Sequence, residues 1–123
     1  MLESLARDVA VLDASVMAAI RTLGEPGEPD VFAEVARIFL DDVPRHLDAM
    51  DDAIAAGRAD SVEQLAHRLR GGALEMGALR MAPLCAAIEE AAHAGSLQQA
   101  ETRAAALRGE FDAASIALRD AIQ

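Results

Sequence analysis

The sequence of 123 residues lacks tryptophan and tyrosine, and it contains only three phenylalanines and one cysteine, Cys85. One cysteine cannot form an internal disulfide, so a reducing cytoplasm is the expected compartment. β-Branched residues are sparse, which disfavours a sheet. No apolar run approaches the roughly 20 residues of a membrane span. The first ten residues lack the charged-then-apolar layout of a signal peptide.

Lysine is also missing, because all eleven basic residues are arginines, and they face 21 acidic residues for a net charge of −10. Such a surface repels nucleic-acid phosphates and anionic membranes, so neither is expected as a partner. Apolar residues make up 53% of the chain, and many of them are alanine. This composition is typical of helices. The length fits a single domain over 1–123.

Apolar residues recur at spacings of three and four along most of the chain. The longest stripe runs from Phe32 to Ile54, with Asp30 as the expected N-cap and Gly57 as the stop. Pro44 lies inside this stripe and should kink the helix without breaking it. Other helices are predicted over about 14–23, from Asp60 or Ser61 to 76, from 81–83 to 95, and from 96 to the end. The predicted fold is all-α, an antiparallel four-helix bundle with a short additional N-terminal helix.

The stretch AHRLRGGALEMGALRMAPLC (66–85) places a histidine beside arginines and glycines within a predicted helix. At 100° per residue, His67 lies opposite the apolar face formed by Leu69 and Met76. It shares its side of the helix with Gln64. The periodicity therefore predicts that His67 is exposed to solvent, which excludes a buried structural histidine.

Two glycines follow at once, although glycine inside a helix costs about 0.5–1 kcal/mol relative to alanine. Gly71 is one turn after His67, and its missing side chain should leave room for a phosphoryl group or a partner's backbone. Gly72 points toward the core and is expected to let a neighbouring helix come near. Arg70 offers forked donors suited to phosphate oxygens, whereas Arg68 is less well aimed. The two arginines predict a small anion-friendly spot, and the alternative is a solvated face on which Glu63 and Glu75 neutralise them.

The segment 66–95 resembles the signature of histidine-containing phosphotransfer (HPt) domains, which are modules of multistep phosphorelays. The family pattern is Ala-His-x-Leu-Lys-Gly, followed by Gly-Ala and then by Leu-Cys and Leu-Glu steps on the next helix. The matching residues are Ala66, His67, Leu69, Gly71, Gly77, Ala78, Leu84, Cys85, Ile88 and Glu89. The order of the upstream helices is similar too, so the resemblance covers nearly the whole chain. The chain departs from the pattern at Arg70, usually lysine, and at His93, often arginine.

The resemblance implies that His67 accepts a phosphoryl group from a receiver-domain aspartyl phosphate and passes it to another receiver aspartate. Arg70 would then stabilise the phosphoryl group and Gly71 would provide access. Glu89 would orient the ring. Secondary site residues are Arg68, Gln64, Glu89 and His93. Stabilisation from the side of His93 is expected to be weaker than in the family, or dependent on pH.

The expected partners are receiver domains of response regulators, a hybrid histidine kinase, or both. The receiver is expected to supply Mg²⁺, so this chain needs no cofactor of its own, and it should be a monomer. Leu74, Ala78 and Met81 are candidate apolar contacts for a docking receiver, with peripheral packing as an equally weighted alternative. The initial methionine and the complete set of helices favour a free-standing protein.

Alternative functions are weighed against these residues. A helical bundle that only docks partners, with His67 incidental, is the main alternative. The dimerisation half of a histidine kinase is a weaker third alternative, because such helices carry a different motif after their histidine and no glycine-rich ATP-binding segment follows here. A free-standing kinase of this length is excluded on the same ground. A di-iron site is rejected, since Glu90 and His93 supply only one of the two Glu-x-x-His pairs required. Cys85 has apolar neighbours and is predicted to be inert core.

Overall fold

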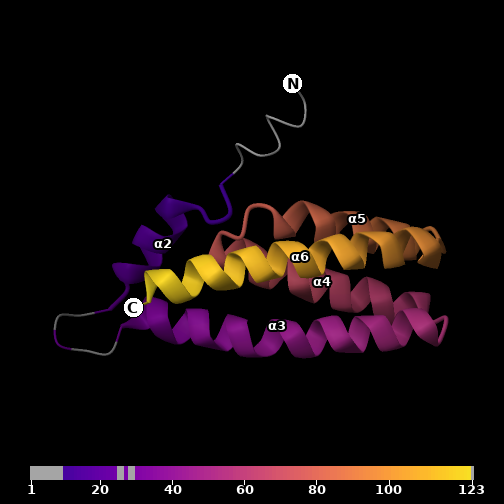
Figure 1. The fold of residues 1–123 in the computed structure, drawn as a ribbon, viewed down its shortest axis with the longest axis horizontal. Helices are drawn as coiled ribbons and strands as arrows, with labels where there is room; N and C mark the ends of the chain where they lie inside the picture. The colour runs from indigo at the N-terminus through magenta and orange to yellow at the C-terminus, as the bar shows by residue number, and fades with distance from the viewer. Residues whose placement is uncertain (1–9, 25–26, 28–29, 123) are drawn as a thin grey trace, which may run out of the picture.

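The computed structural model describes residues 10–24, 27 and 30–122, and within these ranges it contains five helices and one isolated β-bridge. The helices are α2 (Ala14–Arg21), α3 (Val31–Ala55), α4 (Ala59–Met76), α5 (Met81–His93) and α6 (Leu97–Ala121). Figure 1 shows the four longer helices, α3 to α6, running alongside one another. No helix in the described ranges is long and apolar enough to cross a membrane.

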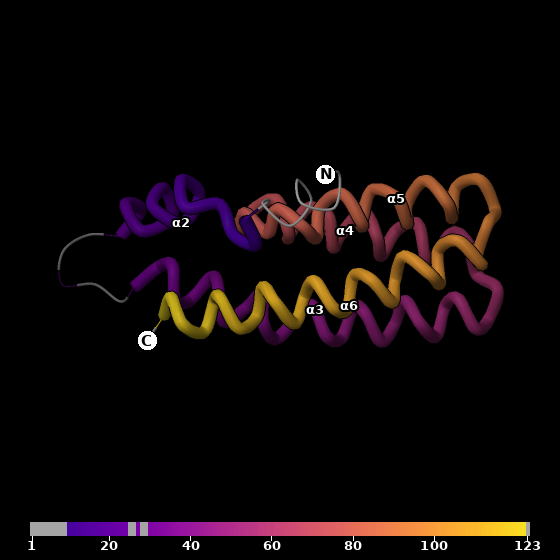
Figure 2. The backbone as a smooth tube through the Cα atoms, turned by 45° about the horizontal axis from the view of Figure 1, so that its top comes forward, coloured from indigo at the N-terminus to yellow at the C-terminus, as the bar shows by residue number. Residues whose placement is uncertain are grey.

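The four longer helices form an antiparallel bundle in which each helix packs against the next and α3 also packs against α6. The shorter α2 packs against α3 and α4 at one end of the bundle (Figure 2). This arrangement confirms the predicted four-helix bundle with a short additional helix. It also puts α4 and α5, the two helices of the His67 segment, side by side.

Two predicted N-caps are confirmed. Asp13 accepts a hydrogen bond from the backbone N–H of Ser15, and Asp30 accepts one from that of Phe32. The Ser15 hydrogen bonds also lower the pKa of the Asp13 carboxyl. The long α3 continues through Pro44 without a break, as expected, and the kink at Pro44 stays a prediction.

The predicted start of α4 at Asp60 or Ser61 is wrong, since the helix begins at Ala59 with Arg58 in the N-cap position. Arg58 provides no side-chain cap. Its backbone N–H instead donates to the Ala53 carbonyl of α3 at 2.9 Å, which closes a tight helix-ending turn. The chain therefore passes from α3 into α4 before it reaches the capping side chains.

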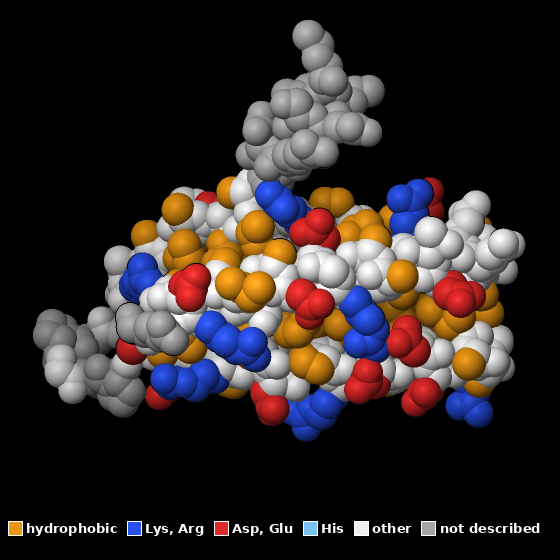
Figure 3. Space-filling model, in the orientation of Figure 1, with side chains coloured by type: hydrophobic (Ala, Val, Ile, Leu, Met, Phe, Trp, Pro, Cys, Tyr) orange, Lys and Arg blue, Asp and Glu red, His pale blue; other side chains and the backbone are white. Residues whose placement is uncertain are grey.

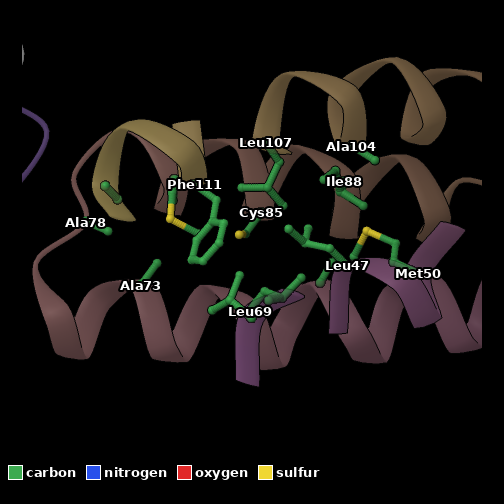
Figure 4. Packing of buried hydrophobic residues seen from close by; sticks show 14 of the residues in the cluster. Leu47, Met50, Leu69, Ala73, Ala78, Cys85, Ile88, Ala104, Leu107 and Phe111 are labelled. Carbon is green, nitrogen blue, oxygen red and sulfur yellow. The ribbon is translucent and has the colours of Figure 1, made fainter. Parts of the chain in front are cut away.

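The core follows the predicted apolar stripes and runs the length of the bundle. Figure 4 shows side chains of α3, α4, α5 and α6 pointing toward one another, with Cys85 among them. The rings of Phe39 and Phe111 pack with centroids 5.9 Å apart, which joins α3 to α6. Other fully buried large side chains are Phe32, Met50, Val62, Leu69, Met76, Met81, Ile88, Leu107 and Leu118.

The turn between α4 and α5 is tied to the segment that precedes α2. The Asp13 N–H donates to the Gly77 carbonyl at 2.8 Å, and the Leu79 N–H donates to the Val11 carbonyl at 3.1 Å. Gly77 ends α4 in the left-handed conformation, with a φ of 69°. A Cβ built there would lie 2.9 Å from Cβ of Val16. Glycine is therefore required at this position, and residues 11–16 pack directly on the turn.

Charged side chains alternate in sign on the face of the bundle seen in Figure 3, and no histidine is visible on that face. Arg108 of α6 pairs with Asp48 and Asp51 of α3 at 2.9 and 2.7 Å. Both carboxylates raise the pKa of the Arg108 guanidinium. Because all three side chains are exposed, such pairs contribute little to stability.

Candidate functional site

His67 lies on the outer face of α4, where 67% of its side chain is exposed. Its neighbours Ala66 and Leu69 are buried on the opposite side of the helix. Exposure of His67 is what the helical periodicity predicted. The imidazole can therefore be reached by a partner without any movement of the bundle.

The ring is held by a carboxylate from the neighbouring helix. His67 Nδ1 lies 3.0 Å from Oε1 of Glu89 on α5. A carboxylate can only accept a hydrogen bond, so in this contact Nδ1 carries the proton. The lone pair of the neutral ring is then on Nε2. Glu89 thus selects the tautomer with a nucleophilic Nε2.

Glu89 also contacts Arg70, so one carboxylate joins two side chains of α4. Its Oε2 lies 3.3 Å from Nη1 of Arg70. The Glu89 side chain is only 22% exposed, whereas that of Arg70 is 37% exposed. Partial burial strengthens the attraction between the two charges relative to a fully solvated pair. The three residues His67, Glu89 and Arg70 form one connected group across α4 and α5.

Gly71 and Gly72 have different surroundings. A Cβ built at Gly71 would meet nothing within 4 Å, so the predicted open space one turn after His67 is present. A Cβ at Gly72 would lie 3.8 Å from the Phe39 ring, which is an ordinary contact distance. The expectation that Gly72 allows a close helix approach is therefore wrong, because alanine would fit there too.

The space beside the His67 ring is lined by more carboxylates than arginines. A shallow hollow beside the ring is lined by Asp60, Glu63, Gln64, His67, Arg68 and Glu89. Arg68, which was predicted to be the less well aimed arginine, lines this hollow. Arg70 is engaged by Glu89 and lines two adjoining hollows. The expected anion-friendly spot is wrong in this respect, since three carboxylates face the space beside the imidazole.

His93, the last residue of α5, makes a second contact between histidine and glutamate. Its Nδ1 lies 3.0 Å from Oε1 of Glu63 on α4. The His93 side chain is 81% exposed, and that of Glu63 is 34% exposed. Sequence reasoning missed this pair, because the two residues are 30 positions apart and nothing in either helix alone indicates it.

Of the three predicted docking contacts, only Leu74 is at the surface, with 61% of it exposed. Ala78 and Met81 are each 1% exposed, so their assignment as docking contacts is wrong. The helix α4 ends at Gly77, so the positions after it no longer follow the helical periodicity used for the prediction. Ala78 is then covered by the bridge to Leu12, and Met81 points into the core at the start of α5.

An apolar groove between α3 and α4 was not predicted. Gly71 and Gly72 lie along it, and Val35, Phe39 and Met76 line it. Ile38 of α3 also lines it and is 62% exposed. The signal available in the sequence was Ile38 itself, which is an apolar residue off the main stripe of its helix. The groove adjoins the open face at Gly71, on the α3 side of the His67 helix.

Two further features of the described residues are the burial of Cys85 and the placement of potential metal ligands. Cys85 is fully buried, and desolvation raises the pKa of its thiol to about 12, so it is inert as predicted. In the part of the chain that the structure describes, no group of three or more His, Cys, Asp or Glu side chains is arranged to hold a metal ion.

The fold of this helical bundle is similar to that of solved structures of histidine-containing phosphotransfer proteins. Histidine-containing phosphotransfer protein B (HptB) from Pseudomonas aeruginosa PAO1 is 28% identical, with a TM-score of 0.84, over 92% of this chain and 95% of that chain. The maize protein ZmHP2 is 22% identical, with a TM-score of 0.77, over 99% and 96%. MtHPt2 from Medicago truncatula is 21% identical, with a TM-score of 0.78, over 98% and 86%. The two plant structures show likeness of fold alone.

A family model described as the Hpt domain matches residues 34–117. The match spans more than half of the chain and includes α4 and α5 in full. The chain therefore belongs to the Hpt domain family, and it is a phosphotransfer intermediate of phosphorelay signalling. Hpt domains work with receiver domains and kinases. Comparison with curated protein sequences gives no significant match.

Proposed function

We propose that His67 is the residue that carries the phosphoryl group. The observation that supports this most strongly is the contact of its Nδ1 with Glu89 on an otherwise open imidazole. The neutral ring then offers Nε2 to the solvent side as the nucleophile. The other two histidines fit less well. His46 is half-buried beside the α3–α4 groove, and His93 lies at the negative end of a helix.

The transfer needs no acid or base from this chain. The Nε2 lone pair attacks the phosphorus of an aspartyl phosphate, and a nitrogen–phosphorus bond forms. The acyl phosphate oxygen–phosphorus bond breaks, and its electron pair stays on the aspartate carboxylate. No proton moves, because Nδ1 keeps its hydrogen. The reverse sequence returns the phosphoryl group to another receiver aspartate.

Glu89 has a second role once the group has been transferred. A ring that carries a phosphoryl group on Nε2 and a proton on Nδ1 is cationic. The Glu89 carboxylate at 3.0 Å from Nδ1 balances that charge. Arg70 balances the carboxylate in turn. It follows His67 by three residues, about one helical turn, so we expect its guanidinium to contribute a donor to the phosphoryl oxygens. Gly71 leaves the approach open.

The partner supplies what the site lacks. The hollow beside His67 holds three carboxylates, so most of the charge of the phosphoryl group must be neutralised by the receiver. We expect the receiver to hold Mg²⁺ for this purpose and the present chain to need no cofactor. The receiver would dock over Leu74 and Ile38, the exposed apolar residues on α4 and α3.

We further propose that the chain is a cytoplasmic monomer and that it exchanges phosphoryl groups with response-regulator receivers, a hybrid kinase, or both. It has no kinase activity of its own. Size-exclusion chromatography with light scattering tests the monomer. A dimer that leaves His67 exposed would change the oligomeric part of the proposal only.

The deciding experiment is phosphoryl transfer from a panel of radiolabelled phospho-receivers to wild type, His67→Gln and His46→Gln. His46 serves as the matched control because it is another histidine of the same bundle. We expect label on wild type and His46→Gln that survives base and is lost in acid, and no label on His67→Gln. A folded wild type that binds receivers but takes no label would instead favour a docking module without phosphotransfer.

A further inference from the structure

Two contacts between histidine and glutamate cross the boundary of α4 and α5 in opposite senses. His67 of α4 contacts Glu89 of α5, and His93 of α5 contacts Glu63 of α4, both at 3.0 Å. Glu63 is four residues before His67, and His93 is four residues after Glu89. Residues spaced by four are neighbours on a helix surface, so the second contact is one turn from the first.

Glu63 lies where it opposes a phosphoryl group on His67. It lines the hollow beside the ring together with Asp60 and Glu89, and Arg68 is the one arginine in that lining. The phosphoryl group would add up to two negative charges at Nε2. Glu89 is offset by Arg70 at 3.3 Å. For Glu63 the contact given by the structure is His93.

We propose that His93 is a positioning residue for phosphotransfer: it holds the Glu63 carboxylate toward the end of α5 and offsets its charge, so that the carboxylate opposes the phosphoryl group on His67 less. The proposal rests on His67 being the phosphorylated residue. His93 acts through Glu63 and does not touch the phosphoryl group in this arrangement. Its role therefore disappears when Glu63 is neutral.

The surroundings of His93 fit this role and do not fit that of a second acceptor. The hollow at His93 is lined by Glu63 and Arg70 from α4 and by Glu89 and Glu90 from α5, and no described residue of α6 contributes to it. His93 is also the last residue of α5, where the helix carbonyls carry partial negative charge. A phosphoryl anion on His93 would be repelled, whereas an imidazole that donates to a carboxylate is stabilised.

A double-mutant cycle separates the two residues. Wild type, His93→Gln, Glu63→Gln and the double variant are each phosphorylated with phosphoramidate, which needs no protein partner. In this reaction the Nε2–phosphorus bond forms while the phosphorus–nitrogen bond of the donor breaks and ammonia leaves with the electron pair. Intact-mass spectrometry follows the gain of phosphoryl group, and urea unfolding checks that each variant is folded.

We expect His93→Gln to accept phosphate about three- to fivefold more slowly than wild type, as for loss of one exposed charge partner. Glu63→Gln should be at least as fast as wild type, and the double variant should match Glu63→Gln. His93→Arg keeps a donor beside Glu63 and carries a permanent charge, so it should accept phosphate at least as fast as wild type.

Two results overturn the proposal. One is a His93→Gln rate equal to that of wild type. The other is a double variant as slow as His93→Gln, because His93 would then act on the phosphoryl group without Glu63. A folded wild type that accepts no phosphate from phosphoramidate or from any phospho-receiver would overturn the function proposed for His67 as well, and it is recognised by the absence of label in every variant.

Discussion

His67 Nδ1 and Glu89 Oε1 lie 3.0 Å apart across the boundary between α4 and α5, and the other oxygen of the same carboxylate lies 3.3 Å from Arg70 Nη1. The Glu89 side chain is mostly buried while His67 is mostly exposed. Glu89 thus holds Nδ1 on the side of the ring that faces the protein, and Nε2 lies on the solvent side. Orientation of the nucleophile and access to it are provided by different helices.

The first prediction concerns the charge of Glu89. Glu89→Gln keeps an oxygen that can accept from Nδ1 but removes the charge that balances the phosphorylated ring. We expect phosphoryl acceptance from phosphoramidate to slow by about tenfold, equivalent to about 1.4 kcal/mol. Glu101→Gln on the exposed face of α6 is the control and should leave the rate unchanged. A rate for Glu89→Gln equal to that of wild type would assign Glu89 to structure alone.

The second prediction concerns the open space at Gly71. Gly71→Leu places a side chain one turn from His67, where nothing lies within 4 Å of the position of a Cβ. Transfer from a phospho-receiver should slow by at least about tenfold because the docked geometry is displaced. Transfer from the much smaller phosphoramidate should change little. Gly109→Leu on α6 has equally open surroundings and is the control. Equal slowing with both donors would mean that the leucine covers the ring itself.

The third prediction compares two glycines that share a left-handed backbone. Gly77 has a φ of 69° and a built Cβ 2.9 Å from that of Val16, whereas Gly57 has a φ of 72° and nothing within 4 Å. Gly57→Ala should lower the free energy of unfolding by about 1 kcal/mol, from backbone strain alone. Gly77→Ala should lower it by about 2–3 kcal/mol, because the contact with α2 is added. Urea denaturation measures both. Equal losses of unfolding free energy would show that Val16 moves away from the new Cβ without a measurable loss of stability.

The fourth prediction concerns Cys85, whose burial raises the pKa of its thiol to about 12. The unfolded thiol loses its proton near pH 9, while the folded one keeps it. The contribution of Cys85 to stability is therefore fully present below pH 9 and is lost as the pH rises toward 12, by about 1.4 kcal/mol per pH unit. Unfolding free energies at pH 8 and pH 10 measure this slope.

Cys85→Ala is the control for that slope. It removes the titrating thiol and should flatten the pH dependence by the same amount. In the native protein at pH 8, alkylation by iodoacetamide should proceed only at the rate of unfolding, because the thiol is both covered and protonated. Rapid alkylation without unfolding would contradict the burial of Cys85.

Features that depend on one helix at a time could be predicted from the sequence. The spacing of apolar residues predicted each long helix, and the same periodicity placed His67 outside and Met76 inside. Asp13 and Asp30 were recognised as caps because a cap acts on the next few backbone groups only. These rules involve only residues close together within one helix, so they do not depend on how the helices pack.

Features that depend on how helices meet could not be predicted from single-helix patterns, and the contact of Glu89 with His67 was expected from the family resemblance alone. Extending the phase of α4 past Gly77 put Ala78 on the surface, but the left-handed turn resets the direction of the side chains. The pair of Glu63 with His93 requires knowing that α4 and α5 run antiparallel in one particular register. In this register Arg70 forms an ion pair with Glu89, whereas Arg68 lines the hollow beside His67.

The residues proposed to perform the chemistry, from Glu63 to His93, all belong to one helical hairpin, whereas the apolar groove is completed by α3. Of the two residues proposed to contact the receiver, Ile38 on α3 thus lies outside the hairpin that carries the proposed chemistry. Substitutions on the outer face of α3 could redirect the protein to a different receiver while its nucleophile stays intact. Duplicated copies of such a bundle could in this way diverge into parallel signalling routes that share one transfer reaction yet remain insulated from one another.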